Sequence, residues 1–173
     1  MRILGIDPGT LKLGYGVLEE AFQSIRAEDY GVLTFSSSLP IEHRLYQVHS
    51  HLLNLINMFQ PDEIAVEEPF LGKGENQYVG PAFAVGQAQA AVLIAAAGQA
   101  IPVFRYTPAQ VKRSVADHGT ASKAQVQAMI TMALGIKETI SSSDAADALA
   151  IALCHLRQRQ VAAVLERRAD PGR

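Results

Sequence analysis

Four acidic residues stand where the sequence predicts the ends of regular elements. Asp7 and Glu67 each end a short apolar run that is typical of a buried strand. Asp144 and Asp147 lie in the first turn of a long C-terminal helical pattern, and residues three apart share one face of a helix. Clustered carboxylates repel one another, but hard divalent cations accept oxygen ligands and reverse that preference. The four acids therefore predict a site for Mg²⁺ or Mn²⁺ rather than for zinc.

Each acid also has a simpler interpretation. A Pro-Gly pair follows Asp7, so this side chain could form a turn with its own backbone. An acid in the first turn of a helix, such as Asp144, interacts favourably with the helix dipole. Asp147 comes just before an apolar segment, where a carboxylate is costly unless it is paired or bound to a cation. Glu68 is a rival to Glu67, which we prefer because it directly follows the apolar run, as Asp7 does.

The apolar patterns predict the elements that position these acids. We expect strands at 3–6, 14–19, 30–35, 63–67 and 101–105, and helices at 40–59, at 82–97, from 108, at 123–134 and at 144–159. Short connections predict three antiparallel strands, and helical crossovers lead to two further strands, which gives a five-stranded mixed sheet in an α/β fold. The first and fourth strands can then end at one edge of the sheet, where Asp7 and Glu67 would meet.

Length and composition indicate a globular protein. At 173 residues, with 49% hydrophobic and 18% charged residues, we expect a single domain over 1–160 and a charged, disordered tail over 161–173. The one cysteine, Cys154, lies in an apolar helical pattern and favours a reducing cytoplasm. Apolar runs fall far short of the roughly 20 residues that span a membrane, and charges interrupt the N-terminus where a signal peptide needs an apolar core.

Charge is distributed unevenly along the chain. Residues 1–100 hold five Lys/Arg and eleven Asp/Glu, whereas residues 101–173 hold ten and six. This asymmetry suits metal-binding carboxylates beside a basic surface that binds phosphates, although accidental variation of surface charge explains it equally well. Lys123 stands at the first position of its helix, where the dipole disfavours a cation, which indicates a role elsewhere.

Because two cations about 4 Å apart can activate a water and stabilise a leaving oxygen, we predict metal-assisted phosphodiester hydrolysis.

Five motifs, in order along the chain, carry a family resemblance. Gly5-Ile-Asp-Pro-Gly9, Ala65-Val-Glu67, Gln110-Val-Lys112, Ser122-Lys123 and Asp144-Ala-Ala-Asp-Ala-Leu-Ala150 resemble the motifs of the RuvC family of bacterial Holliday-junction resolvases, in the ribonuclease-H-like superfamily. The resemblance covers Met1 to about Leu156. It implies a ribonuclease-H-like fold with helices on both faces of the sheet. It also implies a Mg²⁺-dependent endodeoxyribonuclease that resolves four-way DNA junctions by paired symmetric nicks during recombination and repair.

The resemblance assigns roles to individual residues. The catalytic metal ligands would be Asp7, Glu67, Asp144 and Asp147, with two Mg²⁺ ions per site and Mn²⁺ as a substitute; Lys123 would also be catalytic. The DNA contacts would come from Phe70, Lys112, Arg113 and Lys123, with Arg105 broadening the basic surface. The alternatives are solvated lysines at helix ends and a core anchor at Phe70.

The resemblance also implies partners. The helix at 82–97 would form a homodimer, with a plain core helix as the alternative, and the RuvA and RuvB branch-migration complex would be a further partner. Two departures from the family pattern fall in the junction-reading region: the stretch from Phe70 to Gly86 is a few residues longer, and Gln89 replaces a common arginine.

Three other functions remain to be weighed. Asp7 to Thr10 also resembles the phosphate loop of ATP-using proteins of the actin and sugar-kinase type, but those proteins duplicate the fold and 173 residues leave no room for a second copy. A related nuclease acting on structured RNA would share the acids at Asp7 and Glu67. A non-catalytic junction-binding protein would lack an acid, and none is missing here.

Overall fold

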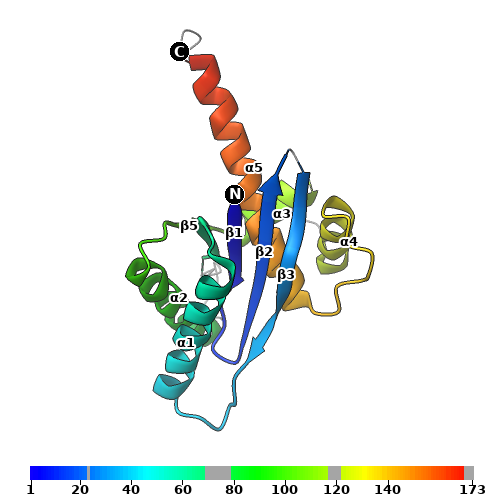
Figure 1. Cartoon of the computed structure of the whole chain (residues 1–173). Coiled ribbons are helices and arrows are strands. Elements are labelled where there is room, and N and C mark those ends of the chain that lie inside the picture. The colour runs from blue at the N-terminus through cyan, green and yellow to red at the C-terminus, as the bar shows by residue number, and fades with distance from the viewer. Residues whose placement is uncertain (23, 69–78, 117–121, 170–173) are drawn as a thin grey trace.

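The computed structural model describes residues 1–22, 24–68, 79–116 and 122–169 of the chain. Within these ranges it contains five strands and five helices (Figure 1). The strands are β1 (Arg2–Asp7), β2 (Lys12–Ala21), β3 (Ser24–Thr34), β4 (Glu63–Glu67) and β5 (Val103–Tyr106). The helices are α1 (Ile41–Phe59), α2 (Val79–Gly98), α3 (Pro108–Ala116), α4 (Lys123–Ala133) and α5 (Ser143–Ala169).

The strands form the mixed sheet that the sequence predicted, in the order β3-β2-β1-β4-β5. The pairs β1/β2 and β2/β3 are antiparallel, whereas β1/β4 and β4/β5 are parallel and are reached through α1 and α2. β3 begins at Ser24, six residues before the expected start. The start of this strand was predicted too far along the chain, because β3 is an edge strand and its first half alternates exposed and half-buried side chains. That half therefore lacks the apolar run by which a strand is recognised in a sequence.

Helices cover both faces of the sheet, as expected. Successive side chains of β1 alternate between the faces: Leu4 and Ile6 pack in the cluster that α1 and α2 complete, whereas Ile3 packs with α3, α4 and α5. Gly5 and Asp7 share the parity of Ile3 and therefore face α5. Figure 1 shows α1 and α2 on one side of the sheet and α3, α4 and α5 on the other.

α5 lies unusually close to the sheet because glycines line its path. A Cβ atom at Gly5 would come within 2.2 Å of the Ala148 carbonyl oxygen, and one at Gly14 within 2.1 Å of the Asp144 carbonyl oxygen. Gly16, the register partner of Gly5, is similarly covered by α5. Only glycine leaves room for this approach of backbone to backbone. The height of the first turns of α5 above β1 and β2 is fixed in this way.

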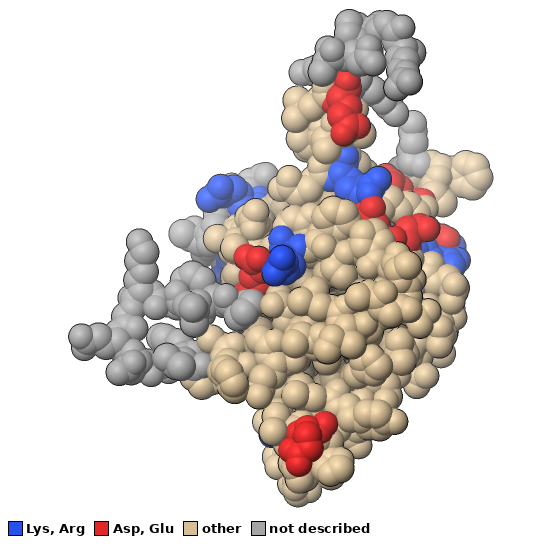
Figure 2. All heavy atoms as spheres, turned by 90° about the vertical axis from the view of Figure 1, so that its left-hand side faces the viewer, with Lys and Arg blue, Asp and Glu red and all other residues tan. Residues whose placement is uncertain are grey.

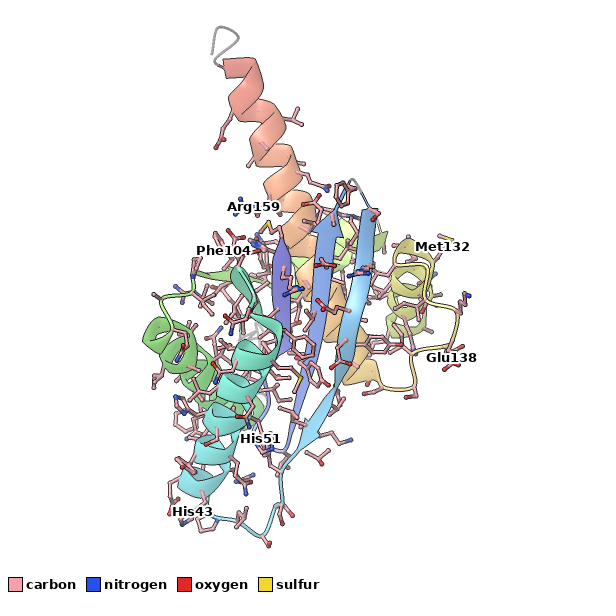
Figure 3. The ribbon with its side chains drawn as sticks, viewed as in Figure 1. His43, His51, Phe104, Met132, Glu138 and Arg159 are labelled. Carbon is pink, nitrogen blue, oxygen red and sulfur yellow. The ribbon has the colours of Figure 1, made fainter. Side chains whose placement is uncertain are left out.

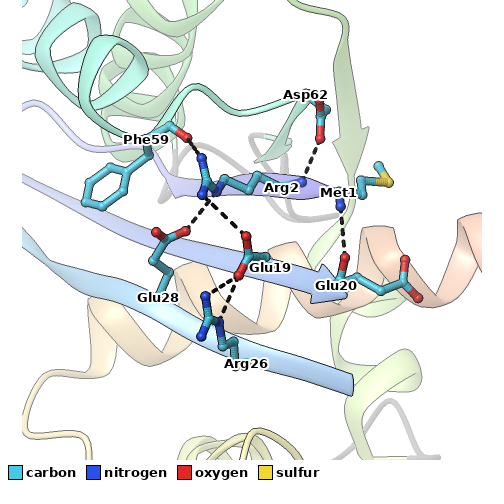
Figure 4. A network of polar contacts seen from close by, with 8 residues as sticks. All are labelled: Met1, Arg2, Glu19, Glu20, Arg26, Glu28, Phe59 and Asp62. Carbon is cyan, nitrogen blue, oxygen red and sulfur yellow. Dashed lines mark hydrogen bonds and ion pairs between the residues drawn. The ribbon is translucent and has the colours of Figure 1, made fainter. Parts of the chain in front are cut away.

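The opposite end of β1 is held by a polar network around Arg2 (Figure 4). Its guanidinium donates to the Phe59 carbonyl at 3.1 Å and pairs with Glu19 at 3.3 Å and Glu28 at 3.0 Å. The Arg2 backbone N–H donates to Asp62 at 2.7 Å. The network joins the start of β1 to β2, β3 and the connection between α1 and β4. Since β1 is anchored here, Asp7 at its other end has a defined position.

The C-terminal boundary of the last helix was predicted wrongly. We expected the helix to end near Arg159 and residues 161–173 to be disordered, but α5 continues to Ala169. Residues 161–166 are exposed, and Figure 1 shows this end of α5 projecting from the body of the molecule. The C-terminal end of α5 consists of Ala, Val, Leu, Glu and Arg, several of which are good helix formers. Extending a helix that has already formed requires no new nucleation step. Residues 170–173 lie outside the described residues.

Within the described residues, no helix combines the length and hydropathy that crossing a bilayer requires. Cys154 is free and buried within α5, in the apolar pattern that the sequence indicated.

Candidate active site

Asp7 and Glu67 lie at the ends of neighbouring parallel strands. β1 and β4 pair with Ile6 opposite Val66, so the two acids that follow stand at the same level of the sheet. Both have the parity that faces α5. Glu68 lies one position beyond β4, in the opposite parity, and its backbone N–H donates to the Tyr106 carbonyl at 2.8 Å. The geometry therefore favours Glu67 over Glu68 as the partner of Asp7.

The other two acids come from the first turns of α5. The Asp144 main chain packs on Gly14, and Gly14 is the register partner of Asp7. Asp147 follows one turn later, with its side chain 27% exposed. The Ser142 hydroxyl accepts the Ala145 N–H at 3.5 Å, so a serine, rather than Asp144, supplies the side-chain oxygen at the start of the helix. Asp144 lies in the first turn of α5, so its favourable interaction with the helix dipole holds beside any role at the site.

The four carboxylates share one electrostatic environment. Burial and the charges of Glu67, Asp147 and Asp144 together raise the pKa of Asp7 to about 7, against the opposing effect of Lys123. Burial also raises the pKa of Glu67 to about 7, together with the charge of Asp147 and against Lys123 and Lys112. Such mutual repulsion is relieved either by protons or by a cation.

The donor set fits a hard divalent cation, because all four groups offer carboxylate oxygens. As the side chains stand, no group of three Asp, Glu, His or Cys residues in the described ranges is arranged to hold a metal ion. These two observations are compatible, since charges interact over several ångströms whereas ligation requires oxygens about 2 Å from the ion.

Lys123 lies directly beside the acids. Its ammonium Nζ is 3.3 Å from Asp147 Oδ2, and the charge of Asp147 is the main reason that the pKa of Lys123 is raised. The helix start that carries it is closed by the predicted capping box, in which Ser122 accepts from the Gln125 N–H and Gln125 accepts from the Ser122 N–H. The lysine side chain remains 73% exposed, so it can also meet a ligand from solvent.

A pocket of about 180 Å³ opens between β4, α3, α4 and α5. It is lined by Glu67, Pro108, Val111, Lys112, Lys123, Val126 and Asp147. Two acids and two lysines therefore share one small concave surface. Such a surface suits an anion that is bridged to the carboxylates by a cation.

Other residues singled out from the sequence are placed differently. Arg113 is exposed on α3, outside the lining of this pocket. Arg105 pairs in register with Val66, on the face of the sheet opposite to Glu67. We expected Arg105 to broaden the basic surface at the site, but it lies on the wrong face to do so. Phe70 and most of the longer stretch from Phe70 to Gly86 lie outside the described residues.

Gln89 has a role that the sequence did not reveal. The resemblance places it in the junction-reading region; it is 8% exposed, and its amide donates to the Glu67 carbonyl at 3.1 Å. The side chain thus supports the strand end that carries Glu67, from a position 22 residues away in the sequence. Only the replacement of a common family arginine marked this position as unusual.

Comparisons with known proteins agree along nearly the whole chain. The family model described as crossover junction endodeoxyribonuclease RuvC matches residues 3–155. A crossover junction endodeoxyribonuclease RuvC of Dehalococcoides mccartyi is 46% identical over 159 residues, which cover 92% of this chain and 93% of the relative. Another, from Chloroflexus aggregans, is 46% identical over 155 residues, with 90% and 92% covered.

Solved structures show the same likeness. Thermus thermophilus RuvC superposes with a TM-score of 0.81 at 37% identity, covering 94% of this chain and 97% of the other. The T. thermophilus RuvC in complex with a Holliday junction substrate gives a TM-score of 0.84 at 37% identity, with 94% and 96% covered. The yeast mitochondrial Holliday junction resolvase, at 15% identity and a TM-score of 0.66, shares the fold.

Proposed function

Because the chain belongs to the RuvC family of crossover junction endodeoxyribonucleases, we propose that the acids ending β1 and β4 and opening α5 perform its cleavage reaction. The protein is a Holliday-junction-resolving endonuclease with the ribonuclease-H-like α/β fold. This conclusion sets aside the kinase-like, RNA-cleaving and non-catalytic alternatives.

One observation carries the assignment of Asp7 and Glu67. Burial and the neighbouring acids raise the pKa of both to about 7. Nuclease families of this kind depend on divalent metal, and we propose that Asp7, Glu67, Asp144 and Asp147 hold two Mg²⁺ ions, with Mn²⁺ as a substitute. A bound cation pair would activate a water and stabilise the leaving oxygen of the phosphodiester. The protein's own contribution is a cluster of oxygens that release their protons near neutral pH.

Lys123 has two roles in this proposal. It compensates the charge of Asp147, 3.3 Å away, and it presents its exposed ammonium group at the mouth of the pocket. Lys112 lines the same pocket from α3, and Arg113 adds charge next to it. These three cations would contact the DNA backbone near the phosphate to be cut, which positions the strand without reading its sequence.

Phe70 follows Glu67 by three positions in the chain. We propose that its ring disturbs base stacking at the centre of the junction, the role that family members give to an aromatic residue here. A Phe70→Leu protein would then cut an intact four-way junction more slowly while keeping its rate on a junction whose central base pairs are already open. Equal loss on both substrates would argue for a different role.

We propose that α2 forms the homodimer interface. Phe83 and Ile94 are 67% and 64% exposed, and Ala90 and Ala97 lie on the same side of the helix at coiled-coil spacing. α2 contains no charged residue, and Figure 2 shows a broad area free of Lys, Arg, Asp and Glu on the side where α1 and α2 lie. Pairing of this face with a second copy would relate two active sites by a two-fold axis, as paired symmetric nicks require.

The remaining proposals rest on the family. Residues 1–160 would act as one nuclease domain in a reducing cytoplasm, to which the free, buried Cys154 is suited. RuvA and RuvB would be its partners in branch migration.

The assignment of the acids is tested with a synthetic four-way junction and Mg²⁺. The parent protein should make paired nicks, and Asp7→Asn should abolish them while junction binding in EDTA persists. Glu138→Gln, an exposed acid between α4 and α5 (Figure 3), is the matched control and should cut like the parent. Cleavage by Asp7→Asn at the parental rate would refute the assignment.

A further inference from the structure

A buried polar cluster surrounds His155, eight residues beyond Asp147 on α5. His155 of α5 is 1% exposed, and its Nε2 lies 2.6 Å from Glu63 Oε2 at the start of β4. Its Nδ1 lies 2.7 Å from the hydroxyl of Tyr106 at the end of β5. In the described part of the chain, these are the only two hydrogen bonds between buried side chains. The cluster joins α5 to the two parallel strands that follow β1.

Every polar atom of the cluster has a partner if His155 is neutral. Nε2–H then donates to the Glu63 carboxylate, and Nδ1 accepts the Tyr106 hydroxyl proton. Arg159 pairs with the other oxygen of Glu63, so the buried carboxylate has a cation at its solvent side. The ring of Phe104 stacks on His155, with the ring centroids 4.4 Å apart. Figure 3 shows Phe104 and Arg159 together where α5 leaves the sheet.

Where α5 lies closest to the sheet, small residues make much of the contact, and Leu149 packs over Gly16. Gly5 packs against Ala148 and Ala152, and Gly14 packs against the Asp144 main chain. Small side chains permit close approach, but they offer few projections that would resist sliding along the helix axis. Buried polar residues commonly fix the register of such apolar contacts.

The spacing of the cluster matches that of the acids. Glu63 and Glu67 are four residues apart on β4, about 13 Å, and share one face of the strand. Asp147 and His155 are eight residues apart on α5, about 12 Å. β4 runs toward the acids and α5 runs away from them. Where β4 and α5 lie together, His155 therefore contacts Glu63 at one end, and Asp147 and Glu67 lie at the other end.

We propose that His155, through Glu63 and Tyr106, is a positioning residue that sets the axial position of α5 and so holds Asp147 at the level of Glu67. A slip of α5 by one residue would move Asp147 by about 1.5 Å, which is large against the tolerance of a metal site. Tyr106 is also the register partner of Glu67, so the cluster fixes β5 beside the same acid. The inference rests on the proposed roles of Asp147 and Glu67.

The test compares His155→Ala, His155→Gln and Tyr106→Phe with Ile151→Val, a fully buried α5 residue outside the polar cluster. The measurements are the single-turnover cleavage rate, junction affinity in EDTA, melting temperature, and the rise in melting temperature on adding Mg²⁺. For His155→Ala we expect a rate loss of about 10- to 100-fold, a smaller Mg²⁺-dependent rise and an unchanged affinity in EDTA. His155→Gln, which keeps a donor for Glu63, should recover part of the rate.

A structural role alone predicts a different pattern. All variants would then lose melting temperature, but their rates well below melting would match that of Ile151→Val, which would overturn the proposal. If His155→Ala does not fold, Tyr106→Phe decides, because it removes one hydroxyl and leaves His155 paired with Glu63. Failure of the proposed active site would show separately, as parental cleavage that does not depend on Asp7.

Discussion

The carbonyl oxygen of Asp144 lies over Gly14, where a Cβ atom would come within 2.1 Å of it. Gly14 is also the strand partner of Asp7. One glycine therefore sets the distance between an acid of the sheet and an acid of the helix.

Replacing this glycine should separate the two acids. Gly14→Ala must push α5 or β2 away, because the clashing atom belongs to the main chain, and overpacking of this kind costs about 1–3 kcal/mol. We expect a lower melting temperature and at least about a tenfold loss of cleavage rate. Ile151→Val is the control, since it shortens a fully buried α5 side chain without pushing the helix away from the sheet. Unchanged cleavage by Gly14→Ala would show that α5 adjusts at no cost to the site.

Cation binding should depend on pH near neutrality. The pKa values of Asp7 and Glu67, both about 7, mean that protons compete with the cation for these oxygens. The Mg²⁺ concentration for half-maximal cleavage should therefore fall as pH rises from about 6 to about 8, and level off above that. Mg²⁺ titrations at a series of pH values measure this directly. A half-saturation point that does not move with pH would contradict the raised pKa values.

The metal-free protein should gain stability when Asp7 is neutralised. The folded pKa of about 7 exceeds the ordinary value of 3.8, so the unfolded chain loses its proton first and stability falls as pH rises between these values. Asp7→Asn should be more stable than the parent above pH 7 by about 1–3 kcal/mol, with some of the repulsion relaxed by solvent. Urea unfolding in EDTA should show this difference shrinking to nothing near pH 4. A difference that is equally large at both pH values would exclude titration of Asp7 as its cause.

The two pocket lysines should contribute to DNA binding through charge. Removal of Lys112 or Lys123 should lower the slope of log affinity against log salt by about 1 each. Lys137→Ala, an exposed lysine outside this pocket, is the control and should leave the slope unchanged. Junction binding in EDTA over a range of NaCl concentrations provides the measurement. If Lys123→Ala keeps the parental slope and cleavage rate, its proposed contact with DNA is wrong.

A charge on the exposed face of α2 should dissociate the dimer. Ile94→Glu places a carboxylate at the centre of the proposed apolar interface, which charged residues disfavour. Sedimentation should report a monomer, and the junction should receive single, unpaired nicks. Met132→Glu, on α4 and 78% exposed, is the matched control and should remain dimeric. A dimer that survives Ile94→Glu would place the interface elsewhere.

The sequence predicted the acids of the site and the strands that carry them, but it did not predict the contacts that hold these elements in place. The proximity of Asp7 and Glu67 could be predicted from the sequence, because each ends an apolar run and neighbouring parallel strands end at the same edge of a sheet. The C-terminal end of α5 could not be predicted from the sequence, because the helix at residues 161–166 has no apolar face packed against the body of the protein. Propensity alone was too weak a signal there.

Long-range polar contacts were missed for a physical reason. Tyr106 and Glu63 lie 49 and 92 residues from His155, and local patterns carry no information at such separations. A clue was present in each segment, since Glu63 opens a buried strand and His155 interrupts an apolar helix. The alternating Gly14-Tyr-Gly16 in a strand was a second clue, because glycine inside a strand often marks the close approach of another backbone.

The two environments of α5 have a consequence for how the protein loses activity. Residues 148–154 of this helix are buried, whereas residues 161–166 are exposed. Amide hydrogens at the C-terminal end should therefore exchange by local fraying, while those just beyond the acids should exchange only when the whole domain opens. Because Asp144 and Asp147 are carried by the half that opens last, warming should leave cleavage intact until the fold itself is lost.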